Sequence, residues 1–268
     1  MNFQERLNGQ HVSDGALKGA VKGEWQYLLD EELNGGFGGT NGGVLAAICV
    51  NVARAVSPGR RPIGLDARFI RGFRPGVARV VPTMLNEGRT LTTVSVDILN
   101  EEGKLTTRGT VSLVNPDALG EVEADNIAPA EGDLKAFEDG RIWREPPRQP
   151  IPLIKTFNPR FLGKNSRGTV TAVDTIWDDA GALEEASCIA ADISVGPPVA
   201  AALGGKPLAI PNPDISLRFT GASGNPSWLV STCRLESFNA GLATTRLEVR
   251  DGTTLVAVGV STTTCLKG

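Results

Sequence analysis

Apolar residues occupy nearly every side of one segment, residues 44–56, which only Asn51 and Arg54 interrupt. A helix that is apolar all round must be buried all round. The other strong signals in the chain are alternating apolar and polar positions, which are typical of β-strands. The pattern therefore predicts a sheet curled around one buried helix.

The residues before this helix, 35–43, are mostly glycine. The first N–H groups of a helix have no partners within it, and the helix dipole favours negative charge there. Asn41, Gly42 and Gly43 are therefore candidate substrate-binding residues for a carbonyl oxygen or a phosphate. Gly43 also allows a facing strand or a ligand carbonyl to approach closely. The alternative is a tight glycine turn that holds no ligand.

Alternation predicts one strand before this helix and four strands after it. These strands are expected near residues 23–30, 63–71, 76–85, 90–99 and 104–114. The second half of the chain has the same order of elements. It comprises a strand at 168–177, a helix at 182–192, and strands near 214–220, 227–237, 242–250 and 254–264.

Two local matches show that the second half repeats the first. Arg68-Phe69 corresponds to Arg218-Phe219, and Gly109 corresponds to Gly259, both at an offset of 150 residues. Two copies of strand, buried helix and four strands predict an α+β double hotdog, in which each curved antiparallel sheet wraps around a central helix. The expected organisation is a leader at 1–22, an N-terminal hotdog repeat at 23–115, a Pro-, Ala- and acid-rich linker at 116–152, and a C-terminal hotdog repeat at 153–268.

Composition excludes several classes of function. The net charge of the 268 residues is −3 without a long run of one sign, whereas a nucleic-acid partner needs a clustered basic face. No apolar run approaches the ~18 residues of a membrane span, and the first residues contain no apolar signal segment. The cysteines lack metal-ligand spacing, so we expect buried thiols, no metal, no cofactor and a cytoplasmic location. They are Cys49, Cys188, Cys233 and Cys265.

The single histidine restricts the chemistry. His11 lies in the polar leader, and a Ser-His-Asp triad, a Cys-His pair or a His-ligated zinc would have to use it. We expect it to be exposed and uninvolved. Any reaction must then depend on carboxylates, hydroxyls, amides and backbone N–H groups.

Several short motifs resemble one family. Residues 41–47, NGGVLAA, are similar to the helix start of the double-hotdog acyl-CoA thioesterases, the type II bacterial kind and its thioesterase-like relatives. Further similarities lie at residues 87–90, 189–192, 198–200 and 213–219. The resemblance implies an acyl-CoA substrate, with the acyl chain in a channel lined by residues such as Val44, Leu45 and Ile48. It leaves a homo-oligomer of double hotdogs open.

The resemblance also implies catalytic residues. Asp214 begins a strand and matches the family's aspartate, which activates the water that attacks the thioester. The family's threonine position falls at Glu236 or Ser237, and its glutamine position falls at Ser261. A serine can hydrogen-bond a water, but it lacks the separate donor and acceptor of an amide. The alternative for Asp214 is a structural carboxylate paired with Arg218 or with solvent.

Two other aspartates are candidates. Asp66 is the first repeat's counterpart of Asp214, and it either lines the substrate groove or is a solvated carboxylate beside Arg68. Asp192 is expected at the C-terminus of the second helix, where the dipole disfavours an anion. It is interpreted as a local hydrogen-bond acceptor for the turn at 194–196, with a tunnel-lining residue as the alternative.

Two hypotheses of different classes follow. The first is an acyl-CoA thioesterase in which Asp214 assists attack by water and the helix N-terminus holds the carbonyl oxygen. The second is a catalytically weakened hotdog protein that binds acyl-CoA or serves as an assembly module. Hydration of an enoyl-CoA resembles a family pattern with a catalytic histidine, which the chain lacks outside its leader.

Overall fold

The computed structural model describes residues 5, 7, 9–11, 23–120, 137–143, 151–165, 168–175, 182–204 and 209–266. The N-terminal repeat comprises β2 (Trp25–Leu29), α2 (Gly42–Ala55), β3 (Arg61–Phe69), β4 (Gly76–Glu87), β5 (Leu91–Leu99) and β6 (Leu105–Val114). The C-terminal repeat comprises β9 (Gly168–Asp174), α4 (Leu183–Ala202), β10 (Asp214–Phe219), β11 (Trp228–Asn239), β12 (Leu242–Asp251) and β13 (Thr254–Thr264). The remaining elements are β1 (Gln10–His11), η1 (Glu31–Leu33), η2 (Pro116–Ala118), η3 (Phe137–Asp139), β7 (Arg141–Ile142), α3 (Leu153–Phe157) and β8 (Arg160–Asn165).

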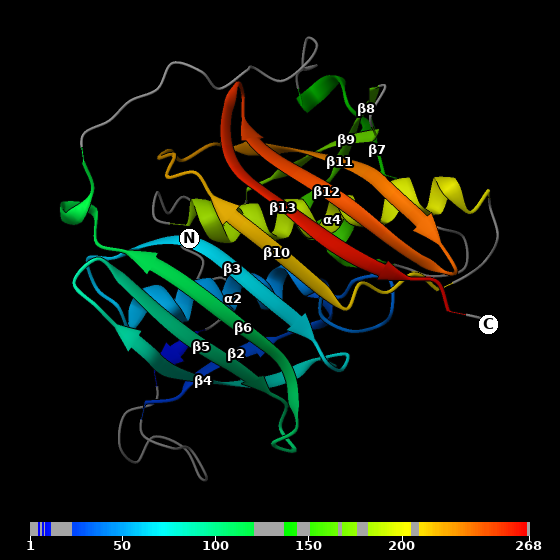
Figure 1. Cartoon of the computed structure of the whole chain (residues 1–268). Coiled ribbons are helices and arrows are strands. Elements are labelled where there is room, and N and C mark those ends of the chain that lie inside the picture. Colours follow the sequence, from blue (N-terminus) through cyan, green and yellow to red (C-terminus); the bar gives the residue numbers. More distant parts are fainter. Residues whose placement is uncertain are drawn as a thin grey trace.

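The strands of the described residues form one sheet in the order β1-β2-β4-β5-β6-β3-β10-β13-β12-β11-β9-β8-β7 (Figure 1). Within it, β2-β4-β5-β6-β3 has the same topology as β9-β11-β12-β13-β10, so the two repeats share one strand order in the sheet, and each has the predicted sequence of strand, helix and four strands along the chain. The repeats join where β3 pairs antiparallel with β10, with Leu65 opposite Leu217. The α+β double-hotdog prediction is confirmed.

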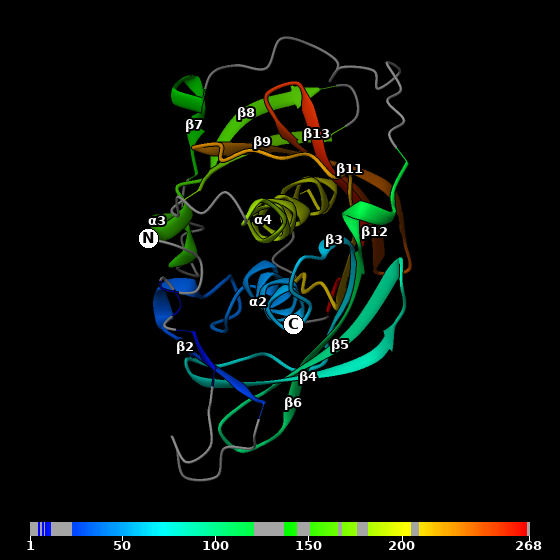
Figure 2. The same ribbon diagram turned by 90° about the vertical axis from the view of Figure 1, so that its left-hand side faces the viewer.

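The two long helices lie side by side inside the curved sheet (Figure 2). In α2, the residues from Gly43 to Val50 are all buried, as the all-round apolar pattern predicts. The helices run antiparallel, because the N-terminus of α2 contacts the middle of α4 and the C-terminal turn of α2 contacts the first turn of α4. Each repeat therefore completes the burial of the other repeat's helix.

The second helix is longer than predicted. The sequence places its end at Asp192, but α4 continues to Ala202 through Pro197 and Pro198. Proline inside a helix removes a hydrogen bond and clashes with the preceding turn, at a cost of about 3 kcal/mol. Most residues of α4 from Leu183 to Val199 are buried against the sheet and α2, and we attribute the continuation of the helix to this burial.

Part of the predicted linker adds to the sheet. β7 pairs with β8, which extends the sheet beyond β9, and the sequence analysis did not predict these strands or α3. The rest of the linker at 121–136 and 144–150, and most of the leader, lie outside the described residues. His11 is exposed as expected, and its ring lies 5.1 Å from that of Trp25. Among the described helices, none combines the length and apolarity needed to cross a membrane.

Candidate functional site

The carboxylate of Asp192 lies where the two repeats meet. Oδ2 accepts a hydrogen bond from Asn41 Nδ2 at 2.6 Å, and Oδ1 accepts one from Asn212 Nδ2 at 2.6 Å. Asp192 is only 8% exposed, although both asparagines are half-buried. Asp192 is thus a buried acceptor of long-range hydrogen bonds, and its interpretation as a local acceptor at a helix C-terminus is wrong.

The position of Asp192 relative to α2 explains how its charge is stabilised. The carboxylate faces the N-terminus of α2, where the backbone N–H of Gly43 also interacts with it. Burial raises the pKa of Asp192, whereas the amides of Asn212 and Asn41 and the Gly43 N–H favour the charged form and lower the pKa. The net effect is a raised pKa, which makes this carboxylate a better proton acceptor than an ordinary aspartate.

Asn41 has two roles because it is also the N-cap of α2. Its Oδ1 accepts from Gly43 N at 3.0 Å and from Val44 N at 3.3 Å, while its Nδ2 donates to Asp192. The preceding chain fixes it, since Asn41 N donates to the carbonyl of Leu33. Gly42 N–H has no acceptor among the described residues, so it is the N–H that remains available to a ligand oxygen.

Asn212 is fixed by its two proline neighbours. The Pro213 carbonyl accepts from Phe69 N at 2.8 Å, and the Pro211 carbonyl accepts from Thr264 N at 2.9 Å. The short segment before β10 is therefore attached to both β3 and β13. Asn212 Oδ1 accepts no hydrogen bond from the described residues, so it is free to accept one from water.

The two glycines of the motif allow close packing. A Cβ on Gly43 would lie 2.7 Å from the Cys188 carbonyl oxygen and 2.8 Å from Ile189 Cα, both backbone atoms of α4. A Cβ on Gly42 would lie 2.7 Å from the Phe69 ring. The close approach predicted for Gly43 is therefore to the other helix, because atoms of α4 fill the space next to it.

Asp214 lies at a different place from the Asp192 carboxylate. It pairs with Arg68 across the β3–β10 junction, and its Oδ1 accepts from Thr262 N at 2.8 Å. The side chain of Arg68 is 66% exposed, which places this ion pair on the outer face of the sheet. Ser261 is buried and donates to the backbone carbonyl of Asp214 at 2.7 Å, so these two predicted residues meet, but not through the carboxylate.

The ion pairs on the outer face of the sheet differ from the pairings that the sequence suggested for Asp214 and Asp66. Those alternatives paired Asp214 with Arg218 and placed Asp66 beside Arg68. In the structure Asp214 pairs with Arg68, and Asp66 pairs with Arg218 at 3.2 Å. The antiparallel register between β3 and β10 opposes Asp214 to Arg68, and no pattern within one repeat specifies that register.

Ser237 and Glu236 lie far from the other candidates. Both are exposed at a bulge near the end of β11, and Glu236 accepts from Arg234 Nε at 2.7 Å. Ser237 is opposite Thr244, which is opposite Thr262, so Ser237 lies two strand spacings, roughly 10 Å, from Thr262. The structure does not bring these two residues to Asp192.

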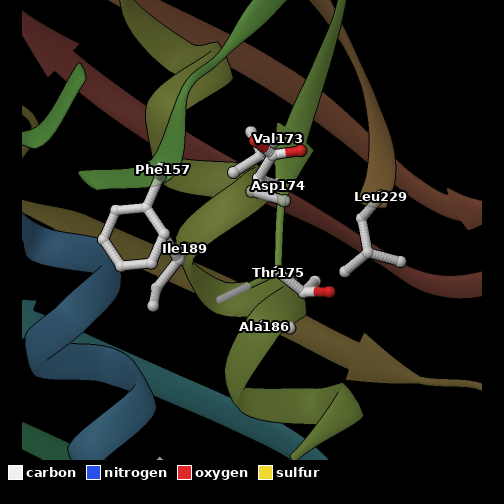
Figure 3. A pocket seen from close by; sticks show the side chains of 8 residues that line it. Phe157, Val173, Asp174, Thr175, Ala186, Ile189 and Leu229 are labelled. Atoms are coloured by element: carbon white, nitrogen blue, oxygen red, sulfur yellow. The ribbon is translucent and has the colours of Figure 1, made fainter. Parts of the chain in front are cut away.

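An apolar crevice runs beside α4 (Figure 3). It is lined by Phe157, Val173, Asp174, Thr175, Ala186, Ile189, Ala190 and Leu229, and it has no room for a water molecule. Ile189 is one helical turn before Asp192. The residues expected to line a channel along α2, which are Val44, Leu45 and Ile48, are packed in the core instead.

At the opposite end of the helix pair, Glu185 is fully buried. It accepts from Arg54 Nη2 at 2.8 Å and from Asn51 Nδ2 at 3.3 Å, and Glu184 shares the same guanidinium. Burial raises the pKa of Glu185 to about 7, although Arg54 lowers it and Glu184 raises it further. This carboxyl therefore titrates near neutral pH.

We expect the titration of Glu185 to make stability depend on pH. Its pKa is about 7 in the folded state and 4.5 ordinarily, so the folded protein binds the proton more tightly. The stability that this group contributes is present below pH 4.5 and is lost as the pH rises towards 7. The free energy of unfolding of wild type relative to Glu185→Gln should therefore fall by roughly 2 kcal/mol between pH 5 and pH 8. Denaturant unfolding of both proteins measures this, and a difference independent of pH would contradict it.

The sequence pattern did not single out Asn212, and it gave Asp192 only as a local hydrogen-bond acceptor or a tunnel-lining residue. The available signal for Asp192 was a single carboxylate inside an otherwise apolar helix, from Cys188 to Ile193. For Asn212 it was an amide held between two prolines directly before a strand. Among the described residues, no three His, Cys, Asp or Glu side chains form a group that could hold a metal ion.

Two fused hotdog units, each a curved sheet around one helix, define the fold class of this protein. Residues 30–114 match the family model of the acyl-CoA thioesterase N-terminal domain. This match and the structural likenesses below confirm the resemblance to double-hotdog acyl-CoA thioesterases. A search of curated protein sequences found no significant match.

Solved structures share the fold over nearly the whole chain. A hotdog-fold protein of unknown function from Alicyclobacillus acidocaldarius has a TM-score of 0.73 at 16% identity, covering 94% of this chain and 96% of its own. The tesB protein of Mycobacterium avium subspecies paratuberculosis has a TM-score of 0.72 at 17% identity, covering 91% and 93%. The acyl-CoA thioesterase II TesB2 from Mycobacterium marinum has a TM-score of 0.69 at 17% identity, covering 91% and 93%.

Proposed function

We propose that this protein hydrolyses the thioester bond of an acyl-CoA, with Asp192 as the general base. The observation that carries the proposal is a buried carboxylate at the N-terminus of α2, beside the N–H of Gly42, which has no acceptor among the described residues. A general base must reach the proton it removes, and a raised pKa brings it nearer to the pH at which it works. The family match at residues 30–114 supports the substrate class.

The reaction begins with a water molecule between Asp192 and the thioester carbonyl carbon. Asp192 takes a proton from the water as the oxygen of that water bonds to the carbonyl carbon. The negative charge that develops on the carbonyl oxygen is stabilised by Gly42 N–H and the positive end of the α2 dipole. The C–S bond then breaks, and Asp192 returns the proton to the CoA thiolate, which leaves a carboxylic acid and free CoA.

The two asparagines position these groups. Asn212 presents its Nδ2 to Asp192, and its Oδ1 is free to accept a hydrogen bond from the attacking water. Asn41 holds the second carboxylate oxygen and at the same time caps α2. The carboxylate and the Gly42 N–H are thereby kept in one fixed arrangement before substrate arrives.

The direct test is release of free thiol from a panel of acyl-CoAs by purified protein. We expect hydrolysis of at least one acyl-CoA at a steady rate that greatly exceeds the rate of its spontaneous hydrolysis.

One observation favours the second hypothesis, a hotdog protein that binds acyl-CoA without turnover. Ser261, at the family's glutamine position, donates its hydroxyl to the backbone carbonyl of Asp214. Measurable acyl-CoA binding without thiol release would support that hypothesis and contradict hydrolysis.

The crevice beside α4 predicts a preference for short acyl chains. It is apolar and lies one helical turn from Asp192, but it is closed to water in the absence of substrate. The Phe157→Leu variant should widen it and shift the preferred chain to greater length. Each further buried methylene adds about 0.8 kcal/mol, which is about fourfold in kcat/KM. A chain-length profile identical to that of wild type would exclude the crevice as the acyl site.

A further inference from the structure

Because the two repeats are related, the structure has two equivalent places, one at the N-terminus of α2 and a second at the N-terminus of α4. Only the first place contains the Asp192 site. Asp192 is the tenth residue of α4, counted from Leu183, and Asn51 is the tenth residue of α2, counted from Gly42. Asn51 correspondingly lies near the first turn of α4, where its Nδ2 donates to Glu185. The second place therefore has an amide where the first has a carboxylate.

The other components of the Asp192 site are also replaced. The N-cap of α4 is Ala182, which offers no side-chain hydrogen bond, whereas α2 has Asn41. The 150-residue offset between the repeats places Pro62 where the C-terminal repeat has Asn212. The second place therefore lacks counterparts of the Asp192 carboxylate and of the Asn41 and Asn212 amides that hold it.

The second place is nevertheless hollow and rich in arginine. A cavity of about 210 Å³ is lined by Arg54, Arg60 and Arg61, together with Pro62 and the first two residues of α4. Its remaining lining residues are Gly59, Pro116, Ala222 and Ser223. It lies near the C-terminus of α2, which is about 20 Å long, whereas Asp192 faces the N-terminus of α2, so the cavity and Asp192 are at opposite ends of that helix.

The charges in this cavity do not cancel. Glu184 is the one carboxylate among the lining residues, and it accepts from Arg54 Nη2 at 2.8 Å and lies 3.8 Å from Arg61 Nε. Arg60 donates only to backbone carbonyls, those of Gly88 at 2.6 Å and Thr90 at 3.3 Å. Within the described residues its guanidinium therefore has no carboxylate partner, and the carbonyls hold it in a fixed orientation.

We propose that this cavity is a second ligand site, which binds a phosphate-bearing anion. Guanidinium groups match the geometry of phosphate oxygens, and the first turn of α4 adds the positive end of a helix dipole. The cavity is larger than one phosphate group, so a phosphorylated small molecule fits it. This site does not depend on hydrolysis at Asp192.

The test is calorimetric titration of the full-length protein with inorganic phosphate and with adenosine 3′,5′-bisphosphate. Wild type should bind at least one of them, and Arg60→Gln should weaken that binding about tenfold or more. The matched control is Arg68→Gln, which removes a guanidinium from the outer face and should leave binding unchanged. Asp192→Asn should also bind normally, because its change lies at the opposite end of the helices.

The same variants distinguish the sources of the phosphate. If it belongs to the substrate's nucleotide, Arg60→Gln raises KM for an acyl-CoA but not for a phosphate-free acyl thioester. If it belongs to a separate molecule, KM for both substrates stays as in wild type while phosphate binding is weakened. Absence of binding to wild type, equal affinity in Arg60→Gln, or loss of binding in Asp192→Asn would overturn the second site. The calorimetric results do not depend on whether the protein turns over acyl-CoA, whereas the comparison of KM values does.

Discussion

Asp192→Asn should lower acyl-CoA turnover by a factor on the order of 10²–10⁴, the usual contribution of a positioned general base. Asparagine keeps the size of the side chain and can still accept a hydrogen bond from Asn41 or Asn212, but it cannot accept the proton of the attacking water. Affinity for the substrate should change little. The measurement is kcat and KM for the best acyl-CoA, together with the melting temperature of the same preparation.

The matched control is Asp214→Asn, the same chemical change at the aspartate that the family resemblance implied as the catalytic residue. It removes an ion pair with an exposed arginine, which is worth up to about 1 kcal/mol, and the rate should be unchanged. One experiment thus distinguishes the catalytic roles of Asp192 and Asp214. A full rate in Asp192→Asn with loss of activity in Asp214→Asn would return the catalytic role to Asp214.

Gly43→Ala should destabilise the protein by roughly 1–3 kcal/mol or more, because its new methyl group meets backbone atoms of α4 that cannot rotate away. Separation of the helices would also move Asn41 and Gly42 away from Asp192, so turnover should fall with stability. Denaturant unfolding and kcat/KM, measured on the same samples, check both effects.

The control for Gly43 is Gly196→Ala, also a glycine-to-alanine change in a central helix. A Cβ there would meet only a methyl group of Ile210, at 4.0 Å. Alanine favours a helix over glycine by up to about 1 kcal/mol, whereas the ring of Pro197, the next residue, crowds a Cβ at position 196. These effects oppose each other, so this variant should stay within about 1 kcal/mol of wild type. Loss of activity in Gly43→Ala at unchanged stability would instead point to a ligand in contact with Gly43.

The sequence was sufficient to predict the elements of each repeat. The all-round apolar pattern of residues 44–56 predicted a helix enclosed by a sheet, and α2 is buried in this way. Alternation placed the strands of both repeats within a few residues, because one face of each strand packs on a helix. The helix around Asp192 was predicted too short. Pro197 and Pro198 locally disfavour the helix that the structure contains there, and burial of α4 overrides that local preference.

The candidate site was harder to predict because it depends on contacts between the repeats. Asn41 and Asp192 are 151 residues apart, and only the antiparallel packing of α2 on α4 brings them together. Likewise, the register of β3 against β10 decides that Asp214 pairs with Arg68. Neither arrangement follows from periodicity within one repeat. Periodicity indicates which face of a helix or strand is buried, but not which element of the other repeat packs against it.

The pH dependence of kcat/KM tests the role of Asp192 most directly. In a Glu185→Gln background, which removes the titration near pH 7, kcat/KM should rise with pH to a plateau because only the ionised carboxylate accepts a proton. Burial raises the pKa of Asp192 above its ordinary 3.8, so the midpoint of the rise should lie above that value. Adding Asp192→Asn should remove the rise from the residual activity. A rise that persists unchanged in that variant would show that another group is the base.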